Sequence, residues 1–220
     1  MLVNPDFSRR AVVTPDQQHW VPSPNPSVER VMLDRLGGEH ARATSLVRYA
    51  PGSVFPAHEH PGGEEILVLR GTFSDASGHY GPGWYLRNPP GTSHQPSSAE
   101  GALIFVKLWQ MQTGRQESLR VDTQDPTLWV TNGPRTRCPL HSSPAEQVSL
   151  ERLAPGEPLA ADTTGGAEWL VQEGGLVDAG ACFDRRSWMR LPPGAACSAF
   201  AGRDGATVYL KTGHLVGMGA

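Results

Sequence analysis

Two histidines and a glutamate in the first half of the sequence have the spacing of a metal site. His58 and His60 are separated by one residue, and Glu64 follows the sequence Pro61-Gly62-Gly63. Residues two apart on a strand point to the same face, so both imidazoles can reach one ion from the same wall. Pro-Gly-Gly predicts a turn, which brings Glu64 on the next strand back beside them. Glu65 would face the other side of that strand and is not expected to be a ligand.

A second block adds a third histidine. His94 follows the sequence Pro89-Pro90-Gly91, whose rigid corner would direct the histidine into the same cavity from a separate strand. An HxH pattern alone is frequent in proteins, but the second block makes the combination specific. We therefore expect His58, His60, Glu64 and His94 to hold one divalent metal ion.

Three neutral imidazoles and one carboxylate suit several metals. Fe(II), Mn, Ni, Co and Zn all accept this donor set, and the residues alone do not choose among them. An ion with an open coordination position would polarise a carbonyl or enolate oxygen, activate water or, as iron, bind O₂. Zinc with all four ligands engaged would instead be structural or act as a sensor.

Short strands must position these ligands. The 25 Gly and 20 Pro interrupt brief apolar segments along the whole chain, which is typical of an all-β sandwich or barrel. Residues 44–49, 65–69 and 102–108 are examples, each rich in β-branched or other apolar residues. No long helical period competes with this pattern, so we expect an all-β protein.

An internal repeat divides the chain. YAPGSVFPAHEHPGGEEILVLRG returns as LAPGEPLAADTTGGAEWLVQEGG, and LRNPPGTSH returns as MRLPPGAAC. We expect a domain at residues 1–112 and a second at 113–220, with the junction in residues 112–118. The ligand positions of the second copy are interpreted as Asp162, Thr164, Glu168 and Cys197. Because they contain no imidazole, we expect a degenerate second site, and an altered metal site is the alternative.

These blocks resemble those of the cupin superfamily. The run from Glu29 to Pro96 is similar to the cupin domain of the ChrR family, named for an anti-sigma factor, and the closing YLKTGHL resembles ChrR-type bicupins. The resemblance implies two tandem jelly-roll barrels, also called double-stranded β-helices. It also implies zinc or a similar ion at His58, His60, Glu64 and His94, and a regulatory or small-molecule role. The HxxxCxxC motif of the anti-sigma protein has no counterpart here, so sigma-factor binding is not expected.

Composition limits the partners. The net charge is -3 and Lys and Arg are not clustered, which argues against binding to nucleic acid or an anionic membrane. No apolar run has the length of a signal sequence or a membrane span, so we expect a cytoplasmic protein with a small-molecule ligand. Exposed sheet edges are compatible with a homodimer. The three cysteines are far apart and are expected to be reduced thiols.

Two functions compete at this stage. One is a metal-binding regulatory, sensor or small-molecule-binding protein, and the other is a cupin metalloenzyme such as a dioxygenase acting on a diketone-type or aromatic substrate. Arg48 or Arg87 would hold an anionic substrate. The residues expected to line the pocket are Phe55, Tyr85, Arg87 and Phe105.

Overall fold

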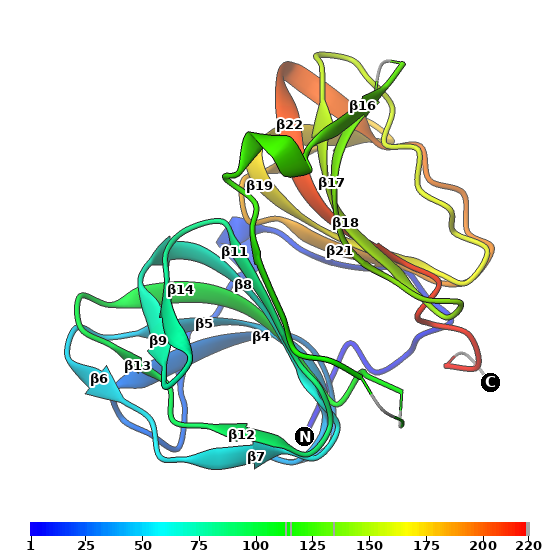
Figure 1. Ribbon diagram of the computed structural model, residues 1–220. Helices are drawn as coiled ribbons and strands as arrows, with labels where there is room; N and C mark the ends of the chain where they lie inside the picture. Colours follow the sequence, from blue (N-terminus) through cyan, green and yellow to red (C-terminus); the bar gives the residue numbers. More distant parts are fainter. Residues whose placement is uncertain (113, 115, 134, 219–220) are drawn as a thin grey trace. The chain divides into compact units, whose positions relative to one another are not determined.

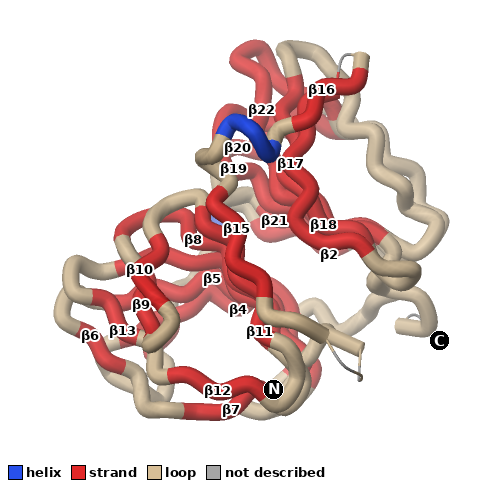
Figure 2. The backbone as a smooth tube through the Cα atoms, in the orientation of Figure 1, coloured by secondary structure: helices blue, strands red, loops and turns tan. Residues whose placement is uncertain are grey.

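The computed structural model describes residues 1–112, 114, 116–133 and 135–218, and these are nearly all strand and loop (Figures 1 and 2). The helices in this part of the chain are the short 3-10 turns η1 (Pro15–Gln17) and η2 (Pro126–Leu128). The prediction of an all-β protein is therefore confirmed. Among the described residues, no helix is long and apolar enough to cross a membrane.

The chain divides into two compact units, each built from two pieces of sequence. The first unit consists of Met1–Pro5 and His19–Gln124, and the second consists of Asp6–Gln18 and Asp125–Ala220. The domain limits expected from the repeat, at residues 112 and 113, remain a prediction about the extent of the two copies. Thr113 and Arg115 of the expected junction lie outside the described residues.

The strands of the first unit are β1 (Leu2–Val3), β3 (Val21–Pro22), β4 (Val28–Leu36), β5 (Arg42–Tyr49), β6 (Ser53–Val54), β7 (His58–His60), β8 (Glu64–Gly71), β9 (Phe73–Asp75), β10 (Gly78–Tyr80), β11 (Trp84–Asn88), β12 (Thr92–His94), β13 (Ser97–Ser98), β14 (Ala102–Leu108) and β15 (Leu119–Asp122). Those of the second unit are β2 (Ala11–Val13), β16 (Val130–Asn132), β17 (Arg135–Ser142), β18 (Gln147–Leu153), β19 (Ala167–Asp178), β20 (Ala181–Asp184), β21 (Trp188–Leu191) and β22 (Phe200–Thr212).

The first unit is an antiparallel barrel. Its large sheet has the order β1-β4-β5-β14-β8-β11-β15, and two small sheets, β10-β9-β13-β6 and β12-β7, lie across from it (Figure 1). Side chains alternate between the two faces of the large sheet, and Ile66, Leu86 and Val106 belong to the apolar core inside the barrel. Their neighbours in sequence point to the other face. This arrangement is a jelly roll, as expected.

The second unit repeats the first. Its sheet has the order β16-β17-β18-β22-β19-β21-β2, so the strand β2 from near the N-terminus completes it by pairing with β21. The register is equivalent: Ala167 lies opposite Leu191 and Thr212, as Glu64 lies opposite Asn88 and Leu108. The duplication of one β unit is therefore confirmed.

A pair of glycines shows how closely the two units agree. Gly71 and Gly174 have φ angles of 69° and 64°. A Cβ at Gly71 would collide with the carbonyl oxygen of Gly101, and a Cβ at Gly174 with that of Gly205. Each lies within two residues of an irregularity in the ladder between its two central strands. Both units thus bend the same strand at the same place, and only glycine fits there.

Candidate metal centre

The four predicted ligands of the first copy are brought together in the structure. His58 and His60 lie on β7, Glu64 begins β8, and His94 ends β12. The antiparallel pair β12-β7 places His94 directly opposite His58. One donor atom from each residue lies within 4.8 Å of the others. Within the part of the chain that the structure describes, these residues form the one cluster of three or more potential metal donors.

The donor atoms surround a common point. The Oε2 atom of Glu64 lies 3.4 Å from Nε2 of His60 and 3.4 Å from Nε2 of His94. The three imidazole rings have centroids 4.6 to 5.1 Å apart. Among the described residues, neither buried Nε2 atom, of His60 or of His94, has a hydrogen-bond partner. A buried nitrogen without a partner is unfavourable, and a metal ion bound by all four residues would satisfy both nitrogens.

Neighbouring groups hold the ligands in position. The Nδ1 atom of His58 lies 2.8 Å from the carbonyl oxygen of Pro56, and that of His94 lies 3.2 Å from Oδ2 of Asp75. A proton on each Nδ1 is donated to these oxygens, which leaves Nε2 free to bind a metal. Asn88 donates from Nδ2 to Oε2 of Glu64 over 2.9 Å. The donor set and its supports therefore fit a divalent ion.

Sequence reasoning missed Asp75 and Asn88. Asn88 directly precedes the Pro-Pro-Gly corner and is replaced by Leu191 in the second copy, so the repeat carried a signal for it. Asp75 gave no such signal. It ends β9 and reaches His94 only because β9 and β12 meet in the folded barrel.

The surroundings of His60 and His94 shift the pKa values of these two histidines in opposite directions. Burial lowers the pKa of His60 and outweighs the charge of Glu64. Burial also acts to lower the pKa of His94, but the hydrogen bond with Asp75 and the charge of Glu64 raise it above its usual value. Asp75 loses solvation on burial, yet its bonds with His94 and Ser77 lower its pKa. His60 thus favours the neutral form that binds metals, whereas His94 holds its second proton more tightly and must lose that proton when the ion binds.

A cavity of about 330 Å³ adjoins three of the four residues. Phe55 lines it, as predicted, and lies edge-on to the ring of His58 with centroids 5.1 Å apart. His58, His60 and Glu64 contribute to the same wall. A ligand in the cavity would therefore meet the metal-binding side chains directly.

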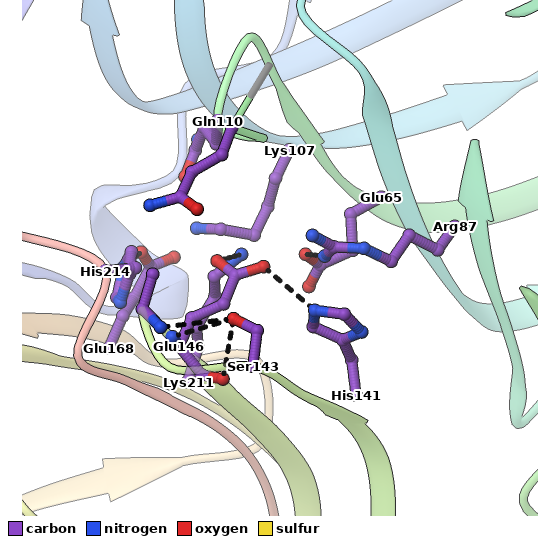
Figure 3. A network of polar contacts seen from close by, with 12 residues as sticks. Glu65, Arg87, Lys107, Gln110, His141, Ser143, Glu146, Glu168, Lys211 and His214 are labelled. Atoms are coloured by element: carbon purple, nitrogen blue, oxygen red, sulfur yellow. Dashed lines mark hydrogen bonds and ion pairs between the residues drawn. The ribbon is translucent and has the colours of Figure 1, made fainter. Parts of the chain in front are cut away.

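Tyr85, Arg87 and Phe105 do not line this cavity, and the expectation for these three is corrected. Leu86 points into the core, so its neighbours Tyr85 and Arg87 point to the other face of the sheet. Phe105 alternates in the same way with core residues on β14. Arg87 instead donates from Nη1 to Oε2 of Glu65 over 3.1 Å (Figure 3). Sequence alone left the facing of these strands open, and a shift by one residue reverses it.

The ligand positions assigned to the second copy are also corrected. Gly165-Gly166 correspond to Gly62-Gly63, and the register then places Ala167, rather than Glu168, where the first copy has Glu64. Glu168 corresponds to Glu65 and lies on the opposite face of its sheet. There it lies 3.2 Å from Nε2 of His214 (Figure 3). It also accepts a hydrogen bond of 2.7 Å from Nε1 of Trp188.

The other three assigned residues are also occupied elsewhere. Asp162 is exposed and accepts a hydrogen bond of 2.9 Å from the backbone N–H of Thr164, which is exposed as well. Cys197 donates to the carbonyl oxygen of Leu159 over 3.4 Å and packs with Ala161 and Ala195 on the apolar core. In the second unit the counterpart of Glu64 is thus Ala167, and Cys197 packs on the apolar core. An altered metal site has no support among the described residues.

The comparisons with known proteins agree with this structure. Residues 8–112 match the family model described as ChrR Cupin-like domain. The chain has the cupin fold. Its first half carries the ChrR-type match, and the whole chain has the bicupin arrangement of two barrels that the resemblance implied.

Solved structures extend the likeness to the cupin fold over both barrels. A putative dioxygenase from Nostoc punctiforme superposes with a TM-score of 0.75 at 13% identity, covering 92% of this chain and 82% of that chain. A putative glyoxylate-induced protein from Pseudomonas aeruginosa gives 0.72 at 17%, covering 96% and 89%. The pirin YhhW from Escherichia coli, in complex with nickel(II), gives 0.62 at 14%, covering 92% and 98%. At these identities the likeness shows the fold alone. The search of curated proteins finds no match.

Proposed function

We propose that this cupin binds one divalent metal ion in its first barrel and a small molecule in the adjoining cavity, in a regulatory or sensor role. The observation that supports the proposal is the convergence of His58, His60, Glu64 and His94 on one point beside the cavity. The described residues of the second unit contain no such group of donors. Its role in the proposal is structural.

Zinc is the first candidate for the ion, because the ChrR-type resemblance implies it. Fe(II), Mn and Ni suit the same donor set. When bound, the ion would supply a Lewis acid at the cavity wall. The chain's own groups would orient the ligands: Asp75 and the Pro56 carbonyl fix two imidazoles, and Asn88 fixes the carboxylate.

A cupin metalloenzyme of the dioxygenase type is the second candidate. The observation that favours it is that three of the four ligand residues line the cavity, so a substrate would have direct access to the ion. The first solved structure above carries the description of a putative dioxygenase, and that description belongs to that protein. Diketone-type and aromatic compounds remain the substrate classes to test.

Elemental analysis of protein purified without oxygen tests the main proposal. We expect one ion per chain in the wild type, almost none in a His94→Ala variant, and the wild-type amount in His19→Ala. His19 is an exposed histidine of the same unit, which makes it the matched control. Full metal content in the His94→Ala variant would show that the ligand assignment is wrong.

Oxygen uptake separates the two candidate functions. Protein reconstituted with Fe(II) is mixed with diketone-type or aromatic compounds in an oxygen electrode. Turnover that requires Fe(II) and disappears in the His94→Ala variant would support the enzyme. Tight zinc binding with no turnover would support the sensor.

Three further expectations belong to this proposal. We propose a cytoplasmic protein that acts on a small molecule rather than on nucleic acid, a membrane or a sigma factor. We also propose that it forms a homodimer, which light scattering coupled to gel filtration would test. A mass equal to one chain at all concentrations would contradict the dimer.

A further inference from the structure

Two arginines share the cavity with the metal-binding residues. Arg30 and Arg35 both lie on β4 and both line the cavity. Arg30 pairs with Val47 of β5, and Arg35 pairs with Ala43. Two residues five positions apart on a regular strand would face opposite sides. Arg30 and Arg35 face the same side because the register shifts between Met32 and Asp34. This bulge turns Arg35 into the barrel.

These guanidinium groups are poorly neutralised for their degree of burial. The side chain of Arg30 is 14% exposed and that of Arg35 is 3% exposed. Glu39 accepts two hydrogen bonds from Arg30, of 2.9 and 2.7 Å, but lies 3.9 Å from Arg35. Arg35 otherwise donates to the carbonyl oxygen of Gly38 over 2.9 Å. One buried and one partly buried cation thus share one carboxylate, and that carboxylate is 54% exposed.

The remaining groups do not offset this charge. Glu64 belongs to the metal centre, and Glu59, which also lines the cavity, is exposed to solvent on β7. Among the described residues, the buried Nε of Arg30 has no hydrogen-bond partner. Burial and the nearby charge of Arg30 both lower the pKa of Arg35. A buried cation of this kind is stabilised by an anion that brings acceptor atoms to it.

Apolar side chains line the cavity together with these charged groups. They include Val28, Val47, Phe55, Ile104, Val106 and Leu108. The volume of about 330 Å³ is at the lower end of the range for small-ligand pockets. A bound molecule therefore needs an apolar body, a limited size and an anionic group.

We propose that this cavity recognises a small carboxylic acid with an apolar body, whose carboxylate is held by Arg30 and Arg35. Two guanidinium groups and one glutamate leave a single positive charge, which one carboxylate matches and a doubly charged phosphate exceeds. The proposal names the ligand class for the function proposed above. Carboxylate binding by Arg30 and Arg35 does not require the metal ion, so an experiment can refute the carboxylate proposal and leave the metal proposal intact, or the reverse.

Calorimetric titration with benzoate, phenylacetate and hexanoate tests this inference, with benzamide and inorganic phosphate as comparison probes. We expect the carboxylates to bind and the neutral amide to bind at least about tenfold more weakly, because the amide cannot form charge-assisted hydrogen bonds with the two guanidinium groups. The variants Arg30→Met and Arg35→Met should each lose about tenfold in affinity while keeping the wild-type metal content. Arg48→Met is the matched control, since Arg48 pairs with Glu29 and does not line this cavity.

Glu39→Gln distinguishes anion recognition from a purely structural role of the arginines. Removing this competing carboxylate should strengthen carboxylate binding, whereas a structural role predicts weaker binding. The His94→Ala variant should lose the metal but still bind carboxylates, more weakly. Equal binding of benzamide and benzoate, undiminished affinity in both arginine variants, or binding of phosphate alone would each overturn the proposal.

Discussion

Replacing Asp75 by Asn tests whether the residues around the metal ligands are needed for tight metal binding. The carboxylate of Asp75 lies 3.2 Å from Nδ1 of His94 and 3.9 Å from the guanidinium of Arg120. Asn keeps the size and one acceptor oxygen but removes the negative charge that favours a proton on Nδ1. His94 should then present Nε2 less reliably, and its imidazole becomes a weaker ligand.

The expected magnitude follows from the hydrogen bond that is changed. Substituting such a partner of a metal-ligating histidine weakens metal binding by about 10- to 100-fold. This corresponds to about 1.4–2.7 kcal/mol, consistent with exchanging a charged acceptor for a neutral one. Because Asn can still accept the hydrogen bond, we expect the loss nearer to tenfold.

Competition with a chromophoric zinc chelator measures this change. The wild type and the Asp75→Asn variant are titrated at constant pH, with Asp122→Asn as the control. Asp122 is a carboxylate of the same unit that accepts a hydrogen bond of 3.0 Å from the backbone N–H of Gln124. Equal zinc affinity in the wild type and the Asp75→Asn variant would refute the reasoning, as would an equal loss in both variants.

Three predictions concern the fold and its thiols. Leu86→Ala, which empties part of the first core, should lower the free energy of unfolding by about 2–5 kcal/mol in urea titrations, and a loss below 1 kcal/mol would contradict the packing. Gly71→Ala should lower the free energy of unfolding by about 3 kcal/mol or more, because the added Cβ meets a carbonyl oxygen. Gly52→Ala, which has open space around its Cβ, should lower it by about 1 kcal/mol. Equal losses in the two variants would contradict the bend at Gly71. Burial raises the pKa of Cys138 to about 11, so iodoacetamide at pH 8 should modify the exposed Cys182 first, and faster labelling of Cys138 would be the opposite result.

The metal site could be predicted from the sequence because the patterns that indicate it are local. HxH on one strand fixes the relative direction of His58 and His60 whichever way that strand faces, and the Pro-Gly-Gly turn returns the chain to Glu64. Glycine and proline spacing likewise marked the strands, and the segments expected at residues 44–49, 65–69 and 102–108 lie within β5, β8 and β14. Such features need no knowledge of which elements meet.

The features that were wrong or missed depend on register and on distant contacts. The direction of Tyr85 and Phe105 could not be predicted, because the sequence does not show whether the odd- or the even-numbered residues of their strands point into the barrel. Arg35 enters the cavity only because a bulge shifts β4 by one position. Asp75 reaches His94 through the folding of separate strands.

The N-terminal segment shows the same limit on a larger scale. β2 completes the sheet of the second unit by pairing with β21, far along the chain. The repeated sequence begins at Tyr49, well after β2, so the repeat did not indicate that β2 pairs with β21. A compact unit therefore does not have the same limits in the sequence as a copy of the repeat.

Anomalous diffraction from crystals of the zinc-loaded protein would test the central claim most directly. We predict one strong zinc peak per chain, with Nε2 of His58, His60 and His94 and a carboxylate oxygen of Glu64 at about 2.0–2.2 Å from it. A peak away from these four side chains, or a second equally strong peak in the other barrel, would contradict the account.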